Sequence, residues 1–117
     1  MLIRVGVGPR MSQAVVANGM VYTAGQVDDS PGAAAQTAAI LEKIDALLAA
    51  AGTDKSNAVC ANVWLADMTD FNAMNRVWEA WVTPGSPPTR ATVESRLAGP
   101  QYLVEITVVA VLADSAR

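Results

Sequence analysis

Residues 103–112 read Leu-Val-Glu-Ile-Thr-Val-Val-Ala-Val-Leu, a run in which Glu105 is the only charged side chain. β-Branched and aliphatic residues dominate this run, which predicts a strand. A strand this apolar is typical of a buried sheet. The fold must therefore contain a β-sheet that other parts of the protein cover. Glu105 is out of place in such a strand, because a carboxylate there needs a partner or a function.

A second strand-like segment carries the opposite charge. It reads Pro87-Pro88-Thr89-Arg90-Ala91-Thr92-Val93-Glu94, and strand alternation places Arg90 on the same face as Thr92 and Glu94. A planar guanidinium binds carboxylates bidentately, so Arg90, with Glu105 on a neighbouring strand, predicts a site for a small anionic substrate. A structural ion pair between Arg90 and Glu105 explains the same residues equally well.

The composition excludes several classes of protein. The chain has 117 residues, a net charge of −3 and no histidine, and its lysines and arginines form no cluster. It therefore lacks the charge pattern of a nucleic-acid-binding protein. Without histidine it also lacks Ser-His-Asp and Cys-His constellations, histidine-based ribonuclease chemistry and most zinc sites. Proton transfer must fall to Asp, Glu, Tyr, Lys or water.

Length and hydrophobicity predict one domain over residues 1–117. Hydrophobic residues make up 52% of the chain, which indicates apolar surface buried between subunits or in buried strands. The first residues lack the apolar stretch of a signal peptide and no run could span a membrane, so we expect a cytoplasmic protein. Cys60 has no partner for an intramolecular disulfide and is expected to be a small core residue.

The predicted elements are three strands, a helix, a strand, a second helix and two further strands. Asn18-Gly19 predicts a tight hairpin between the second and third strands. Apolar residues three and four apart predict the first helix, which Gly52 ends. Asp67 or Thr69 can cap the second helix. In chain order, the expected ranges are strands 2–5, 14–17 and 20–24, helix 33–50, strand 59–65, a helix to about 82, and the strands that carry Arg90 and Glu105.

A polar residue interrupts the apolar stripe of the second predicted helix. Asn75 lies on the stripe formed by Phe71, Met74, Trp78, Trp81 and Val82. A buried amide must find hydrogen-bond partners, either in a ligand or in neighbouring backbone, and both interpretations are open. Trp64, Trp78 and Trp81 are expected to pack in a core or an interface rather than on bases, because no basic residues accompany them.

Several short motifs follow one another along nearly the whole chain: 12–15 (Ser-Gln-Ala-Val), 21–26 (Val-Tyr-Thr-Ala-Gly-Gln), 35–37 (Ala-Gln-Thr), 50–52 (Ala-Ala-Gly), 63–68 (Val-Trp-Leu-Ala-Asp-Met), 70–75 (Asp-Phe-Asn-Ala-Met-Asn), 88–93 (Pro-Thr-Arg-Ala-Thr-Val) and 104–106 (Val-Glu-Ile). In this order and spacing the sequence closely resembles the RidA/YjgF family of reactive intermediate deaminases. The short amino terminus and the tryptophan-rich second helix resemble its YoaB-like branch.

The resemblance implies a chorismate-mutase-like α+β fold, with a mixed sheet and two helices packed on one face. It also implies a homotrimer with sites between subunits. The implied reaction hydrolyses enamine or imine intermediates, such as 2-aminoacrylate, to a 2-keto acid and ammonia without a metal or a cofactor. We expect neither a nucleic acid nor a membrane as a partner.

The family's site residues map onto named positions of this chain. Arg90 matches the arginine that binds the substrate carboxylate, and Glu105 matches the glutamate that positions or activates water. Gly25 and Asn75 match positions that line the pocket.

Two pocket positions depart from the family pattern. Met11 replaces a tyrosine, and Thr92 replaces a frequent cysteine, so the pocket loses a phenol and a thiol.

Three functions stay open. A deaminase is favoured by Arg90 with Glu105. A trimeric binding protein for small carboxylates such as 2-keto acids, with little turnover, is favoured by Met11 and Thr92. An endoribonuclease or translation inhibitor is disfavoured by the negative charge and the absent histidine.

Overall fold

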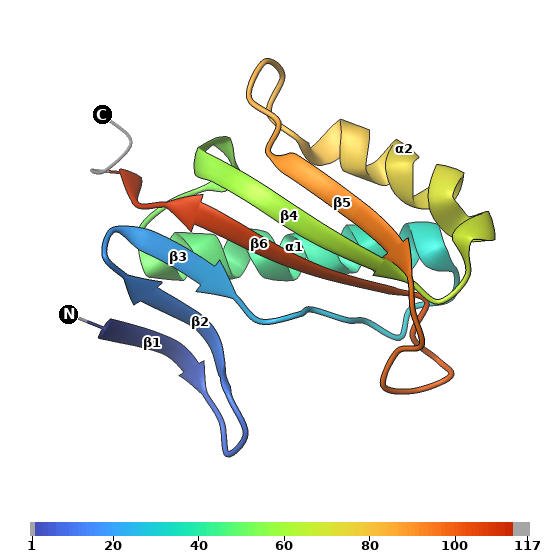
Figure 1. The fold of residues 1–117 in the computed structure, drawn as a ribbon, viewed down its shortest axis with the longest axis horizontal. Coiled ribbons are helices and arrows are strands. Elements are labelled where there is room, and N and C mark those ends of the chain that lie inside the picture. Colours follow the sequence, from blue (N-terminus) through green and yellow to red (C-terminus); the bar gives the residue numbers. More distant parts are fainter. Residues whose placement is uncertain (1, 114–117) are drawn as a thin grey trace.

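The computed structural model describes residues 2–113 and places two α-helices on one face of a single sheet (Figure 1). The elements of the described chain are β1 (Leu2–Val7), β2 (Ser12–Ala17), β3 (Met20–Thr23), α1 (Ala33–Ala51), the 3-10 turn η1 (Lys55–Asn57), β4 (Ala58–Leu65), the 3-10 turn η2 (Met68–Asp70), α2 (Phe71–Trp81), β5 (Thr89–Glu94) and β6 (Val104–Val111). This order confirms the predicted succession of strands and helices.

The strands form one mixed sheet in the order β1-β2-β3-β6-β4-β5. Only β4 and β5 run parallel, and the connection between them contains α2. The other neighbouring pairs are antiparallel. The α+β fold with a mixed sheet and two helices on one face is therefore confirmed. The apolar run around Glu105 becomes β6, with β3 on one side and β4 on the other.

Burial alternates along β6 and divides the sheet into a covered and an uncovered face. Every second residue of β6, from Val104 to Ala110, is completely buried, whereas the residues between them are half-buried. The covered face packs against apolar residues of α1 and α2, among them Ile40, Ile44 and Met74. Because directly paired strand residues share a face, this register assigns every strand side chain to one face or the other.

Local signals in the sequence fix the ends of these elements. Asn18 and Gly19 both have positive φ, 52° and 75°, as a tight hairpin turn requires. Gly52 ends α1 with a φ of 98°, and its amide donates to the carbonyl of Ala49. Asp67 accepts a hydrogen bond from the amide of Thr69 and caps η2, so α2 itself begins only at Phe71.

Two predictions about buried residues have different outcomes. Trp78 and Trp81 are buried on the inner side of α2, with their rings tilted by 43° and their ring centres 5.2 Å apart, which confirms their place in the core. Cys60 was expected in the core, but it is half-buried and pairs with Val109 on the uncovered face. That expectation was wrong because alternation in β4 gives Ala61, not Cys60, to the covered face.

No helix in residues 2–113 is long and apolar enough to cross a membrane.

Candidate functional site

Arg90 lies on the covered face of the sheet, at its edge strand β5. It pairs with Ala61, which in turn pairs with Val108, and both neighbours are buried against the helices. The side chain therefore extends under α2. Burial lowers the pKa of the Arg90 guanidinium from its ordinary value, while the negative charge of Glu79 opposes that shift.

Aromatic rings and a thioether, rather than carboxylates, surround the Arg90 guanidinium. Its Cζ lies 5.3 Å from the ring centre of Trp78 and 5.9 Å from that of Phe71. Its Nη1 lies 3.7 Å from the sulfur of Met74. These contacts are cation–π and sulfur contacts, which hold a cation without neutralising it.

Two buried polar atoms beside Arg90 have no hydrogen-bond partner within the described residues. They are Asn75 Oδ1 and Thr92 Oγ1. Thr92 follows Arg90 by two residues on the same face of β5, and Asn75 lies on α2 between Phe71 and Trp78. The Asn75 interpretation in which its oxygen bonds to neighbouring backbone is therefore not realised in the described chain. We call Asn75, Arg90 and Thr92 the arginine group.

The predicted juxtaposition of Arg90 with Glu105 is wrong within one subunit. Strand β4 lies between β5 and β6, so the two residues are not on neighbouring strands. Glu105 pairs with Trp64 on the uncovered face, whereas Arg90 points to the covered face. Strand spacing and register put their Cα atoms roughly 14 Å apart. Within residues 2–113 the one ion pair joins Lys43 to Asp28, at 3.1 Å, so an Arg90–Glu105 ion pair is not formed there.

The carboxylate of Glu105 lies against the backbone of Gly25. A Cβ atom on Gly25 would come 2.0 Å from Glu105 Oε2, a distance that no side chain at position 25 permits without moving the carboxylate. Gly25 is held there because the next residue, Gln26, exchanges backbone hydrogen bonds with Ile106. Glycine is thus required here for close approach of backbone to carboxylate.

The segment that follows Gly25 is tied to helix α1. Lys43 Nζ donates to the carbonyl of Val27 at 2.6 Å and forms the ion pair with Asp28. Hydrogen bonds from Ser30, followed by the contact with Lys43, lower the pKa of Asp28 to about 2. These contacts fix the chain beside Glu105 from two directions.

Met11 lies in the turn between β1 and β2 and is 54% exposed. The backbone carbonyl of Gln13, two residues further on, accepts a hydrogen bond from the amide of Ala24, so this turn leads directly to Gly25. Strand β2 is four strand positions from β5, roughly 19 Å. Met11 therefore belongs with Gly25 and Glu105, which we call the glutamate group, and is remote from Arg90 in the same subunit.

If the chain catalyses the imine hydrolysis that the family resemblance implies, Gly25→Ala is expected to lower the rate of that reaction by about tenfold or more. Thermal stability should change little, because the new methyl group displaces the flexible end of Glu105 and not a packed core. Gly99→Ala is the matched control. A Cβ there would also meet a flexible side-chain end, Gln101 Oε1 at 2.4 Å, away from both groups. Turnover and melting temperature should be measured for both variants. Full activity of Gly25→Ala would show that the position of the Glu105 carboxylate does not matter.

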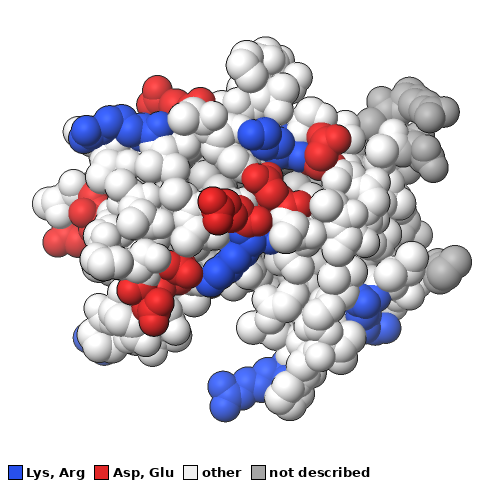
Figure 2. Space-filling model, turned by 180° about the vertical axis from the view of Figure 1, so that it is seen from behind, with Lys and Arg blue, Asp and Glu red and all other residues white. Residues whose placement is uncertain are grey.

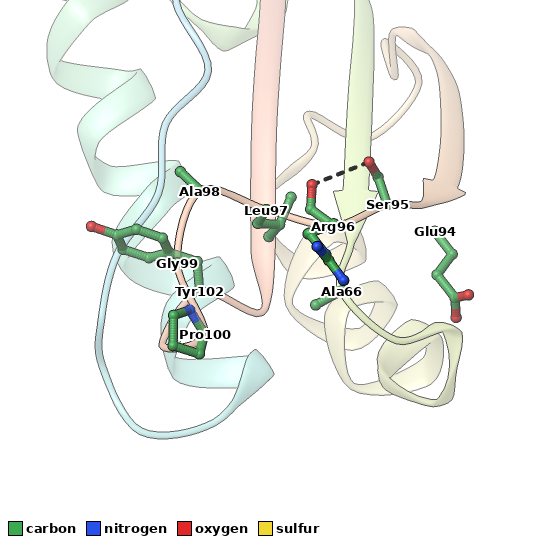
Figure 3. A pocket seen from close by; sticks show the side chains of 9 residues that line it. All are labelled: Ala66, Glu94, Ser95, Arg96, Leu97, Ala98, Gly99, Pro100 and Tyr102. Carbon is green, nitrogen blue, oxygen red and sulfur yellow. Dashed lines mark hydrogen bonds between the residues drawn. The ribbon is translucent and has the colours of Figure 1, made fainter.

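A hollow of about 540 Å³ lies elsewhere, under the loop between β5 and β6 (Figure 3). Arg96 and Glu94 bring one charge of each sign to its lining, and Ala66 and Tyr102 contribute to its walls. It contains none of the six predicted site residues, so the candidate site rests on the two groups and not on this hollow. In the described residues no three His, Cys, Asp or Glu side chains gather closely enough to hold a metal ion.

Charges are scattered over the face that Figure 2 shows. Lysines and arginines alternate there with aspartates and glutamates, and no extended basic patch appears on it. This distribution agrees with the net charge of −3. That face therefore offers no extended basic surface to which the polyanionic backbone of a nucleic acid could bind.

Comparisons with known proteins identify the family of this chain. The family model described as Endoribonuclease L-PSP matches residues 6–112. The chain belongs to the RidA/YjgF family. It is 45% identical over 114 residues to a RutC family protein of Haemophilus ducreyi, covering 96% of this chain and 97% of that protein. The RutC family protein YoaB of Escherichia coli is 41% identical over 110 residues, covering 93% and 96%, which supports the YoaB-like branch.

Solved structures of family members share the fold. A YjgF family protein from Neisseria meningitidis is 45% identical and superposes with a TM-score of 0.95 over 97% of both chains. A YjgF family member from Mycobacterium tuberculosis is 25% identical, with a TM-score of 0.89 over 96% of this chain and 100% of that one.

Reasoning from the sequence missed the residues that surround Arg90. It assigned Phe71, Met74 and Trp78 only to a core-facing stripe. Their spacing of three and four residues around Asn75 was a usable signal, because residues on one helical face share their neighbours.

Proposed function

We propose that this protein is a hydrolytic deaminase of small enamines or imines that carry a carboxylate, such as 2-aminoacrylate, and that it releases a 2-keto acid and ammonia. One observation carries the proposal. Arg90 is held beneath α2 beside two unpartnered buried polar atoms and makes no ion pair with any described carboxylate. A planar carboxylate is the ligand that such a guanidinium fits best.

The complete site in this proposal lies between subunits of a homotrimer. The arginine group and the glutamate group lie on opposite faces of one sheet, so a single chain cannot bring them together. The uncovered face also carries apolar side chains in register across the sheet, including Tyr22 at 44% and Val93 at 48% exposed. A second copy that covers this face would bury apolar surface and complete the site with its own residues.

The proposed chemistry needs few groups. Arg90 binds the substrate carboxylate and Thr92 and Asn75 hydrogen-bond to the ligand. An enamine such as 2-aminoacrylate first takes up a proton from solvent at carbon and becomes the iminium. Water adds to the electrophilic iminium carbon while Glu105 of the adjoining subunit accepts one proton of that water, and a neutral carbinolamine forms. Glu105 then donates this proton to nitrogen, the C–N bond breaks, and the hydroxyl proton passes to the departing ammonia, so the products are the 2-keto acid and ammonium. Neither a covalent nucleophile nor a redox step is required.

A trimeric binding protein for 2-keto acids is the second candidate. Met11 and Thr92 favour it, because the phenol and the thiol that the family pattern has at these positions are absent. The binding protein would keep Arg90 for recognition and would lack turnover. Ribonuclease activity, to which the description of the family model refers, has no comparable support here, since the chain has no histidine and a net charge of −3.

A coupled assay separates these candidates. 2-Aminoacrylate is generated in situ by a pyridoxal-phosphate-dependent dehydratase, and pyruvate formation is followed with and without the protein. We expect a protein-dependent increase over the spontaneous rate. Binding of pyruvate without any rate increase would leave the binding protein as the function, and neither binding nor acceleration would overturn both candidates.

A further inference from the structure

We infer that Phe71, Met74 and Trp78 form a cage that positions the Arg90 guanidinium for the substrate carboxylate, with Phe71 as a positioning residue at its rim. The inference rests on the proposed function, because it concerns the same anion site. It adds a physical reason why Arg90 is available to a ligand at all.

The cage holds Arg90 without an ion pair to any described carboxylate, although the negative charge of Glu79 acts on it from a distance. The three residues lie on one face of α2 at spacings of three and four, and two of them present rings to the guanidinium, at 5.3 and 5.9 Å. A carboxylate in their place would fix Arg90 equally well but would also compete with the substrate for its donors. The two rings restrict its motion without occupying any of its donors, and the Met74 sulfur accepts from Nη1 only, so the remaining donors are left for a ligand.

The cage is itself held to the strand that carries Arg90. Glu94, four residues after Arg90 on β5, accepts a hydrogen bond from the amide of Met68 at 2.9 Å. That bond fixes the 3-10 turn η2, which ends immediately before Phe71. One strand thus supplies both the arginine and the anchor for the helix that covers it.

The three cage residues differ in how far a substitution would disturb the fold. Met74 and Trp78 are buried, at 0% and 6% exposed, and the ring of Trp78 also lies against that of Trp81. Phe71 is 36% exposed. Replacing Phe71 therefore removes one ring from Arg90 without opening a cavity in the core, which makes it the residue to test.

The test compares Phe71→Leu with Phe71→Tyr, which keeps a ring. Titration calorimetry gives the Kd for pyruvate, and the coupled assay gives KM and kcat. We expect Phe71→Leu to raise Kd and KM by about three- to tenfold, the scale of a lost cation–π contact, with kcat nearly unchanged. Phe71→Tyr should stay close to wild type. Melting temperatures of both variants should stay close to wild type, and Phe71→Met, which also lacks a ring, replaces Phe71→Leu if that variant is unstable.

Lys55→Met is the matched control, since it removes a different cation–ring contact, that of Lys55 with Trp81 at 5.5 Å. It should leave Kd and KM unchanged. Wild-type Kd in Phe71→Leu, or an equal loss in Lys55→Met, would overturn the cage.

Arg90→Lys separates this failure from that of the proposed function. If Arg90→Lys loses pyruvate binding while Phe71→Leu keeps it, only the cage is wrong. If Arg90→Lys binds pyruvate as wild type does, both the carboxylate site and the cage that serves it are wrong.

Discussion

Glu105→Gln is expected to reduce imine hydrolysis by about a hundredfold or more, while pyruvate binding stays close to wild type. The amide has nearly the same shape as the carboxylate and fits against Gly25 in the same way. It cannot accept a proton from water. A group that transfers a proton in the transition state and a group that only holds the ligand therefore respond differently to this change.

The measurement is the coupled assay together with calorimetric titration of pyruvate. Glu94→Gln is the control, because it neutralises a carboxylate on β5 but keeps an oxygen that can accept from the amide of Met68. Its turnover should equal that of wild type. A Glu105→Gln variant that turns over as fast as wild type would remove the acid–base role, and one that loses binding and turnover equally would make Glu105 a ligand-holding residue.

The fold was largely predictable from the sequence because its elements carry strong local signals. The hairpin at Asn18-Gly19, the end of α1 at Gly52 and the apolar run of β6 each depend on residues close together in the chain. The start of α2 was less well predicted. Asp67 is a good cap, but it caps η2, and sequence alone does not distinguish a 3-10 turn from the first turn of an α-helix.

The arrangement of the site was less predictable because it depends on strand order. Alternation placed Arg90 and Thr92 on one face, as the register has them. That β4 separates Arg90 from Glu105 follows from a crossover connection, which leaves no mark in either strand's sequence. The prediction that Cys60 lies in the core was wrong for a related reason, since the burial of a strand residue depends on which face of the sheet the helices cover.

Strand order also changes what the resemblance to the family means for this chain. Residues that match one pocket by sequence fall into two groups on opposite faces of the sheet. In a single subunit these groups could not act on one small molecule. Each subunit in the proposed trimer would therefore contribute its arginine group to one site and its glutamate group to another.

Mixing two inactive variants tests this division directly. Arg90→Lys should lose carboxylate binding and Glu105→Gln should lose turnover, but co-expression of the two is expected to restore about a quarter of wild-type activity. The fraction follows from random assembly. Half of the sites receive an intact Arg90, and half of those receive an intact Glu105 from the adjoining subunit.

The matched control for this restoration is the double variant Arg90→Lys, Glu105→Gln, co-expressed with wild type at equal levels. If each site uses two subunits, this mixture also retains about a quarter of wild-type activity, because the same two independent choices apply. If each site uses one subunit, it retains about half, and the mixture of single variants recovers nothing. Activity is measured on the whole co-expressed population, for which these fractions hold. Differently tagged copies show that mixed assemblies form, and the mass of the assemblies should equal three copies of the 12.2 kDa chain. A monomer, or the pattern of half and none, would refute a site shared between subunits.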